Sequence, residues 1–139
     1  MKVLIADDSL LLCARLISML AEFEEVEFVG PARNALQATQ LMNKAKPEVV
    51  ILDIQMGKDN GIDVLKRSKY DQPSLIAIML SNHSSVNYRK RCMEAGADYF
   101  FDKSTEFFAL QDLFRDLTHR PLPTQLYDWT NKSLPRYSE

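Results

Sequence analysis

Several features that mark whole classes of protein are scarce in this sequence. Its 139 residues include only two cysteines, Cys13 and Cys92, and neither belongs to a CxxC or Cys/His pattern. We therefore expect buried thiols in a reducing, cytoplasmic setting rather than a disulfide framework or a zinc site. No apolar run approaches the roughly 18 residues that a transmembrane helix requires. Acids at Asp7 and Asp8 stand where a signal peptide would be apolar, so no membrane insertion is expected.

An excess of either charge is also missing. Lys and Arg number 17 against 19 Asp and Glu, which gives a formal net charge of −2. Domains that coat nucleic acid usually carry a basic excess, so no direct nucleic-acid binding is expected. The 46% of hydrophobic residues is typical of a globular domain. We predict one domain over residues 1–120 and a flexible tail over 121–139, which holds three prolines and is too short for a second domain.

Two periodicities alternate along the first 120 residues. Short apolar runs rich in β-branched residues predict five strands, and helical spacing between them predicts five helices. Such an alternation indicates an α/β fold with a doubly wound parallel sheet that helices cover on both faces. The expected strands are Lys2–Ala6, Val26–Val29, Val49–Leu52, Leu75–Leu80 and Tyr99–Phe101, and the expected helices are Ser9–Phe23, Asn34–Ala45, Gly61–Lys69, Ser84–Ala95 and Thr105–His119.

Charged and polar side chains follow the predicted strands. Asp7-Asp8 ends the first, Asp53 the third and Ser81 the fourth, and Lys103 comes after the fifth. Singly, each acid is also a plausible turn former or helix cap. Together they meet at the carboxyl edge of the sheet, where three carboxylates repel one another unless a cation is present. Oxygen ligands favour Mg²⁺, and a lysine beside them suits a phosphoryl group, so the pattern indicates phosphoryl transfer onto a carboxylate.

These motifs resemble the receiver domain of two-component response regulators, of the single-domain, chemotaxis-like type. The resemblance covers about residues 1–120 and implies a flavodoxin-like fold with strand order 2-1-3-4-5 and five helices. The matching segments are Ile5-Ala6-Asp7-Asp8-Ser9, Val50-Ile51-Leu52-Asp53-Ile54-Gln55-Met56 with Gly61, Met79-Leu80-Ser81, and Gly96-Ala97-Asp98-Tyr99-Phe100-Phe101-Asp102-Lys103.

The resemblance implies a metal site and a phosphoacceptor. Asp53 would accept the phosphoryl group and would bind Mg²⁺ together with Asp8 and the backbone carbonyl of Gln55. Asp7 would act on the ion largely through water. The phosphodonor would be a histidine kinase or a phosphotransfer protein.

The resemblance also implies a switch. Ser81 matches a hydroxyl that hydrogen-bonds the phosphoryl oxygens, Lys103 matches a lysine that contacts them, and Phe100 matches an aromatic that turns inward. The face made by the fourth helix, fifth strand and fifth helix would then signal to a downstream protein. The chain would be a monomer or a weak homodimer on phosphorylation, and a phosphoacceptor switch rather than a conventional enzyme.

Three departures from the family pattern follow from the sequence. Ser104 stands where the family usually has a proline in a cis peptide, and a cis bond before serine would cost about 3–4 kcal/mol. Gly57 replaces a usual proline, which we expect to loosen the loop after Asp53. Phe100 replaces a frequent tyrosine and has no hydroxyl to hydrogen-bond. None of the three removes a reacting group.

Other functions fit the sequence less well. A phosphorelay shuttle and the receiver fragment of a longer DNA-binding regulator remain alternatives. A haloacid-dehalogenase-like phosphatase would need an acid at Gln55, and a flavodoxin-like cofactor binder would need a phosphate loop where Asp7 and Asp8 stand. His83 lies beside the expected site, and Arg89-Lys90-Arg91 forms either a solvated face or part of a partner surface.

Overall fold

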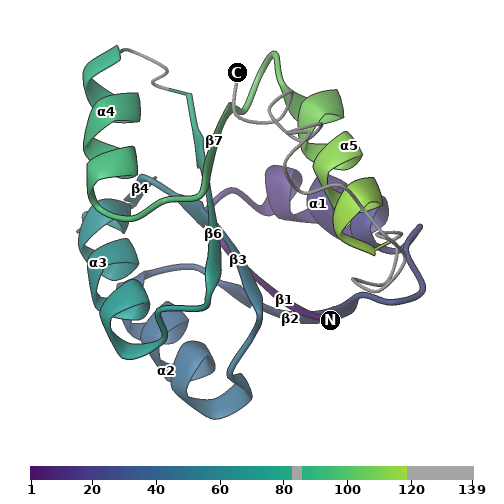
Figure 1. The fold of residues 1–139 in the computed structure, drawn as a ribbon, viewed down its shortest axis with the longest axis horizontal. Coiled ribbons are helices and arrows are strands. Elements are labelled where there is room, and N and C mark those ends of the chain that lie inside the picture. The colour runs from purple at the N-terminus through teal and green to yellow at the C-terminus, as the bar shows by residue number, and fades with distance from the viewer. Residues whose placement is uncertain (83–85, 119–139) are drawn as a thin grey trace, which may run out of the picture.

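A computed structural model describes residues 1–82 and 86–118 of the chain (Figure 1). His83 and the predicted tail over 121–139 therefore lie outside the described residues. The main strands are β1 (Lys2–Ala6), β2 (Glu27–Ala32), β3 (Val49–Asp53), β6 (Ile76–Ser81) and β7 (Tyr99–Asp102). The helices are α1 (Leu10–Leu20), α2 (Ala35–Ala45), α3 (Gly61–Asp71), α4 (Val86–Glu94) and α5 (Phe107–Thr118).

The five main strands form one parallel sheet in the order β2-β1-β3-β6-β7. Counted along the main sheet alone, this is the order 2-1-3-4-5, so the predicted doubly wound fold is confirmed. β1 and β3 are neighbours in the middle of the sheet, and β7 is an edge strand. The carboxyl ends of all five strands lie at one edge, which is where the predicted site residues stand.

Helices cover both faces of the sheet: α2, α3 and α4 lie on one side and α1 and α5 on the other (Figure 1). Side chains alternate between the faces along each strand. In β3, Val50 and Leu52 pack beneath α2 to α4, whereas Val49 and Ile51 pack beneath α1 and α5. All five residues of β3 are buried, which explains why its sequence is a continuous apolar run ending in an acid.

Local sequence explains where the helices begin. Ser9 caps α1, with its side chain accepting a hydrogen bond from the Leu12 N–H, and Asn34 and Asn60 cap α2 and α3 in the same way. Short polar side chains at these positions satisfy amides that the first helical turn leaves without partners. Since Ser9 is the cap of α1, Asp8 is left available for the site.

The structure differs from the sequence-based prediction at some boundaries. α1 ends at Leu20 instead of Phe23, although Phe23 is still buried and packs against Phe114. The second strand extends to Ala32. Two strands that were not predicted, β4 (Gln55–Met56) and β5 (Asp59–Asn60), form a small antiparallel pair after Asp53. Two-residue strands carry no periodicity, so the pattern alone does not predict them.

Two further predictions concern thiols and membranes. Cys13 and Cys92 are both buried, as predicted, and burial raises the pKa of the Cys92 thiol to about 11. Within residues 1–82 and 86–118, no helix combines the length and hydropathy needed to cross a bilayer.

Candidate functional site

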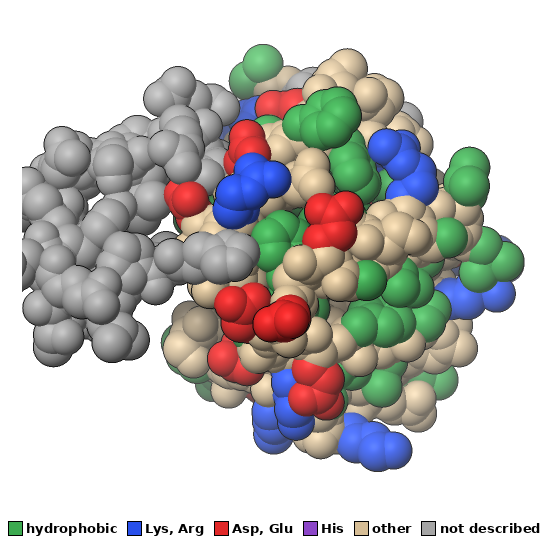
Figure 2. Space-filling model, turned by 90° about the vertical axis from the view of Figure 1, so that its right-hand side faces the viewer, with side chains coloured by type: hydrophobic (Ala, Val, Ile, Leu, Met, Phe, Trp, Pro, Cys, Tyr) green, Lys and Arg blue, Asp and Glu red, His purple; other side chains and the backbone are tan. Residues whose placement is uncertain are grey.

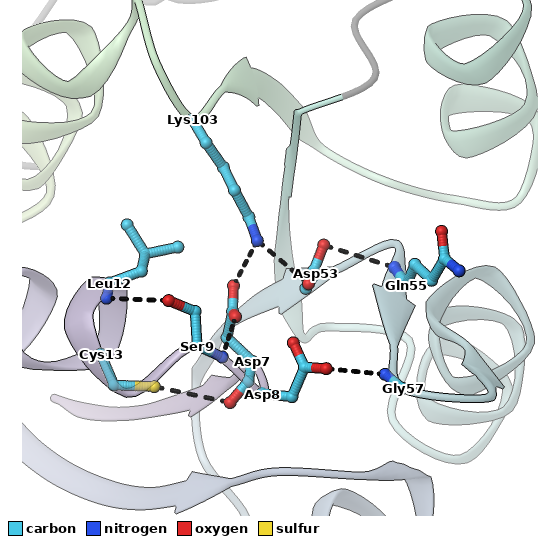
Figure 3. Close-up of polar contacts among 9 residues, drawn as sticks. All are labelled: Asp7, Asp8, Ser9, Leu12, Cys13, Asp53, Gln55, Gly57 and Lys103. Carbon is cyan, nitrogen blue, oxygen red and sulfur yellow. Dashed lines mark hydrogen bonds and ion pairs between the residues drawn. The ribbon is translucent and has the colours of Figure 1, made fainter.

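Three carboxylates come together at the carboxyl edge of the sheet. Asp7 and Asp8 follow β1, and Asp53 ends the neighbouring strand β3. One carboxylate oxygen from each lies within 4.8 Å of those of the other two. Asp7 and Asp53 are buried, whereas Asp8 is exposed, so the cluster opens to solvent on the side of Asp8. The structure therefore brings together the three acids that the sequence places at these strand ends (Figure 3).

Lys103 supplies the positive charge of the site. Its side chain extends from the loop after the edge strand β7, and its Nζ lies 2.8 Å from Asp7 Oδ2 and 3.0 Å from Asp53 Oδ2. Only 11% of the lysine side chain is exposed. The two ion pairs are thus shielded from solvent, and Lys103 bridges the ends of β1 and β3 (Figure 3).

Burial and neighbouring charge perturb the two central groups of the site. Burial, followed by the charge of Asp7, raises the pKa of Asp53 to about 6 despite the opposing effect of Lys103. For Lys103, burial lowers the pKa, but the hydrogen bonds and charges of Asp7 and Asp53 outweigh it and leave the pKa above its ordinary value. One positive charge therefore does not fully compensate the buried acids.

Backbone amides hold each of the three carboxylates. The Ser9 N–H donates to Asp7 Oδ1 at 2.8 Å, and the Gln55 N–H donates to Asp53 Oδ1 at 3.3 Å. The Gly57 N–H donates to Asp8 Oδ2 at 2.8 Å (Figure 3). These hydrogen bonds from the backbone fix the orientation of the three carboxylates.

Gly57 has a role at the site that the sequence does not predict. Its φ of +61° lies in the left-handed region, and its N–H is the donor to Asp8. Proline has a φ near −65° and has no N–H, so the usual proline would supply neither feature. The glycine thus adds a contact to the acidic cluster, although the sequence marks it only as a departure from the family pattern.

Gly61 allows the backbone around Asp53 to close. Its N–H donates to the carbonyl of Ile54, and a Cβ atom at this position would overlap the carbonyl of Asp53. Only glycine permits so close an approach of two backbone segments. The start of α3 is therefore packed directly against the end of β3, which restricts where the Asp53 carboxylate lies.

The loop that carries Lys103 is organised by an aspartate. Asp102 Oδ1 accepts hydrogen bonds from the N–H of Ser104 at 2.8 Å, the hydroxyl of Ser104 at 2.6 Å and the N–H of Thr105 at 3.1 Å. Among the described residues the only cis peptide is Gly30–Pro31, so the Lys103–Ser104 peptide is trans. Side-chain acceptors of this kind stabilise turns, and here one takes the place of the usual proline.

The two predicted switch residues lie in β6 and β7. Ser81 ends β6, is almost fully buried, and its carbonyl accepts a hydrogen bond from the Lys103 N–H at 3.0 Å. Phe100, in β7, is 4% exposed and packs in the core beneath α2 to α4. The guanidinium of Arg89, from α4, lies 4.6 Å from the centre of its ring. Sequence reasoning missed this contact because residues 89 and 100 belong to different elements.

The donor set fits a hard divalent cation. All the side-chain groups in the cluster are carboxylates, and their oxygens are within 4.8 Å of one another. Burial, followed by the charge of Asp7, raises the pKa of Asp53, so a further cation would favour its charged form. Mg²⁺ is commonly bound by one or two carboxylates plus waters, and the exposed Asp8 leaves room for solvent. A second positive charge here would offset the repulsion between Asp7 and Asp53.

Fold and site together define an α/β domain of flavodoxin-like topology with an acidic cluster and a lysine at its sheet edge. The model of the response regulator receiver domain matches residues 3–115. The chain belongs to this family, and it is a receiver domain of two-component response regulators.

Similar proteins carry receiver domains in different contexts. The chain is 32% identical over 121 residues to a protein-glutamate methylesterase/protein-glutamine glutaminase of Clostridium acetobutylicum, covering 86% of this chain and 35% of that protein. It is 30% identical over 106 residues to the uncharacterized transcriptional regulatory protein YhcZ of Bacillus subtilis, covering 76% of this chain and 50% of that protein. The chain thus spans about a third to a half of the length of these relatives.

Solved receiver domains share the fold. The signal receiver domain of a DNA-binding response regulator from Colwellia psychrerythraea is 25% identical, with a TM-score of 0.77 over 84% of this chain and 96% of that one. The response regulator domain of Thermotoga maritima CheB is also 25% identical, with a TM-score of 0.71 over 85% of this chain and 92% of that one. These structures confirm the fold predicted from the sequence.

Proposed function

We propose that this receiver domain, residues 1–120, is a phosphorylation-activated switch whose phosphoacceptor is Asp53. The observation that carries the proposal is the position of this buried carboxylate, which lies 3.0 Å from the Nζ of Lys103 and within 4.8 Å of carboxylate oxygens of Asp7 and Asp8. A carboxylate held this way has beside it a lysine that can contact phosphoryl oxygens and two further carboxylates that can bind a cation. Aspartyl phosphate chemistry needs both.

The proposed reaction transfers a phosphoryl group from a phosphohistidine of a histidine kinase or phosphotransfer protein. The unprotonated carboxylate of Asp53 attacks phosphorus, an O–P bond forms, and the P–N bond to the histidine breaks. The leaving imidazole keeps the electron pair of that bond and takes up a proton. Lys103 stabilises the negative charge on the phosphoryl oxygens, and the Ser81 hydroxyl donates a hydrogen bond to one of them.

We propose that Asp8, Asp53 and the backbone carbonyl of Gln55 bind Mg²⁺ directly, with Asp7 acting largely through water. When bound, the ion would neutralise charge on the transferring phosphoryl group. The amides that orient the three carboxylates, those of Ser9, Gln55 and Gly57, hold this geometry before any ligand arrives. Such preorganisation lowers the reorganisation needed during transfer.

A protein donor is supported by the surface beside the site. Leu10, Leu11 and Phe108 are 62%, 76% and 76% exposed, at the starts of α1 and α5. A shallow groove of about 420 Å³ continues between these helices, lined by residues that include Ala14, Met19, Phe107 and Gln111. Figure 2 shows hydrophobic side chains at the surface on this side of the molecule. Exposed apolar side chains next to a reactive group favour a docking protein over a small phosphodonor alone.

Output passes, in this proposal, through the face formed by α4, β7 and α5 to a downstream protein. Phosphorylation shifts the population between two arrangements of Ser81 and Phe100, and the shift changes this face. A phosphorelay shuttle and a receiver within a longer DNA-binding regulator are the alternatives. The similarity to a transcriptional regulatory protein and to a methylesterase is compatible with several outputs. We place the protein in the cytoplasm.

The test is phosphorylation by a small acyl phosphate such as acetyl phosphate, with and without Mg²⁺. We expect intact-protein mass spectrometry to detect one added phosphoryl group only when Mg²⁺ is present. Asp53→Asn removes the attacking carboxylate and abolishes labelling. Asp63→Asn is the matched control, because Asp63 is an exposed carboxylate on α3 outside the cluster, and this variant is labelled like the wild type.

Labelling of Asp53→Asn at the wild-type level would contradict the assignment of the phosphoacceptor. Equal labelling in Mg²⁺ and in a chelator would contradict the metal requirement while leaving the phosphoacceptor in place. A profile of phosphotransfer from candidate histidine kinases then identifies the donor.

A further inference from the structure

Arg89 makes three contacts that join α4 to β7 and to the residue before α5. Its guanidinium carbon lies 4.6 Å from the centre of the Phe100 ring, and Nη1 donates to the carbonyl of Phe100 at 3.4 Å. Nη2 lies 3.7 Å from Glu106 Oε1. One side chain therefore spans α4, the edge strand β7 and the residue before α5, which are the three elements of the proposed output face.

The side chain of Arg89 is more buried than that of a charged residue that only faces solvent. The side chain of Arg89 is 40% exposed, so more than half of it is buried against its neighbours. Glu106 is itself held in place, since the same Oε1 accepts a hydrogen bond from the Asp102 N–H at 2.8 Å. The planar guanidinium lies over the aromatic ring and can form directed hydrogen bonds at the same time, whereas a lysine ammonium is a point charge.

Phe100 needs such a partner because its side chain has no polar group. A buried tyrosine can be fixed by a hydrogen bond from its hydroxyl, whereas a phenylalanine ring can be held only by packing and by contacts with its π-face. At 4% exposure the ring occupies the inward position, and Arg89 lies over it. The guanidinium of Arg89 thus attracts the face of the Phe100 ring, and this attraction acts only while the ring is inward.

We propose that Arg89 is a positioning residue that holds Phe100 inward and so stabilises the phosphorylated arrangement of the domain. This inference rests on the proposed function, in which inward Phe100 accompanies phosphorylation of Asp53. An interaction present in only one of two states shifts their equilibrium by its full strength. By linkage, whatever favours inward Phe100 also increases the affinity of the acidic site for a phosphoryl group or its analogue, by the factor by which it raises the fraction of molecules in that arrangement.

The experiment measures the affinity of the full chain for beryllofluoride, a phosphoryl analogue, in the presence of Mg²⁺. Arg89→Met keeps most of the aliphatic length and removes the guanidinium, and we expect it to weaken binding by about two- to five-fold. Arg89→Lys retains a cation and recovers part of the loss. Lys90→Met is the matched control, because Lys90 is the exposed neighbour on the same helix, and it leaves the affinity unchanged.

A double-mutant cycle separates a specific contact with the ring from a general effect on the fold. In a Phe100→Leu background the guanidinium has no ring to contact, so Arg89→Met causes a smaller loss of affinity than it does in the wild type. Chemical unfolding of each variant checks that all are folded under the binding conditions. A merely structural role would lower the free energy of unfolding and leave the affinity of the folded protein unchanged.

The outcomes distinguish this inference from the proposed function. Equal affinity of the wild type and Arg89→Met, or an equal effect of Arg89→Met in both backgrounds, overturns the role of Arg89 and leaves the switch intact. Failure of the wild type to bind beryllofluoride, or binding that survives Asp53→Asn, overturns the proposed function and the inference with it.

Discussion

The charge of Asp53 is unfavourable for the metal-free fold. Its pKa of about 6 lies above the value of 3.8 for a free aspartate, mainly because the group is buried and secondly because of Asp7. The native state therefore binds more protons than the unfolded chain between these two values. Stability falls as the pH rises through this window, and the full penalty is present above about pH 6. The same unprotonated form is the one that attacks phosphorus in our proposal.

Replacing Asp53 by asparagine should stabilise the metal-free protein at neutral pH. We expect the free energy of unfolding of Asp53→Asn to exceed that of the wild type by about 1–3 kcal/mol at pH 7.5, and the difference to vanish near pH 4. The amide keeps an oxygen for the Gln55 N–H, and Lys103 keeps its ion pair with Asp7. Urea unfolding over this pH range in a chelating buffer measures the effect.

The exposed Asp63→Asn variant again provides the comparison. We expect it to be no more stable than the wild type at any pH, because Asp63 lies in the first turn of α3, where a negative charge is favourable. A destabilised Asp53→Asn protein at pH 7.5 would show that the Lys103–Asp53 ion pair outweighs the burial of the carboxylate.

Sequence reasoning predicted that four charged groups of the candidate site would meet, because strand ends in a parallel sheet converge at one edge. Asp7, Asp8, Asp53 and Lys103 could be placed without coordinates for that reason. The roles of Gly57 and Arg89 could not be predicted in this way. That of Gly57 depends on its backbone φ, and that of Arg89 depends on a contact between separate elements. Spacing along the chain contains neither kind of information.

At the scale of elements, the loops after the strands position the site as much as the strands do. The hairpin β4–β5 contributes the amide of Gln55 to Asp53, and the turn between its strands contributes the amide of Gly57 to Asp8. The loop after β7 carries Lys103, and Asp102 holds this loop by accepting hydrogen bonds from the N–H groups of Ser104 and Thr105. Element order and type were predictable from periodicity, whereas these short connections were not, because hydrogen bonds between side chain and backbone define them.

Removing the acceptor in the last of these loops should release Lys103. Asp102→Ala loses the hydrogen bonds to Ser104 and Thr105, and we expect a loss of about 1–2 kcal/mol in the free energy of unfolding together with slower labelling by acetyl phosphate. Asp102→Asn retains an acceptor oxygen and should lie close to the wild type in both measurements. Equal labelling rates for Asp102→Ala and the wild type would mean that the ion pairs of Lys103 alone position it.

At the scale of the whole molecule, the acidic cluster predicts a dependence of stability on divalent cations. A ligand that binds only the folded state raises its stability by RT ln(1 + [L]/Kd), or about 2.7 kcal/mol at a hundredfold excess over Kd. We expect Mg²⁺ to raise the melting temperature of the wild type at pH 7.5 and a chelator to reverse the rise. Differential scanning calorimetry measures the change.

Asp8→Asn tests whether that rise comes from the cluster. Asp8 is exposed, so its substitution disturbs the core little, yet it removes one of the three carboxylates. The variant should show a much smaller response to Mg²⁺. A response equal to that of the wild type would indicate that the ion binds elsewhere.

The ion pair between Asp7 and Lys103 joins residues near the two ends of the described chain. Asp7 follows the first strand of the described sheet along the chain and Lys103 follows the last, and the two strands are separated in the sheet by β3 and β6. The counter-charge of the site thus arrives only when the whole sheet has assembled. A nascent or truncated copy that lacks β7 would have the acids without their lysine. The ability to accept a phosphoryl group would then be a property of the completed fold.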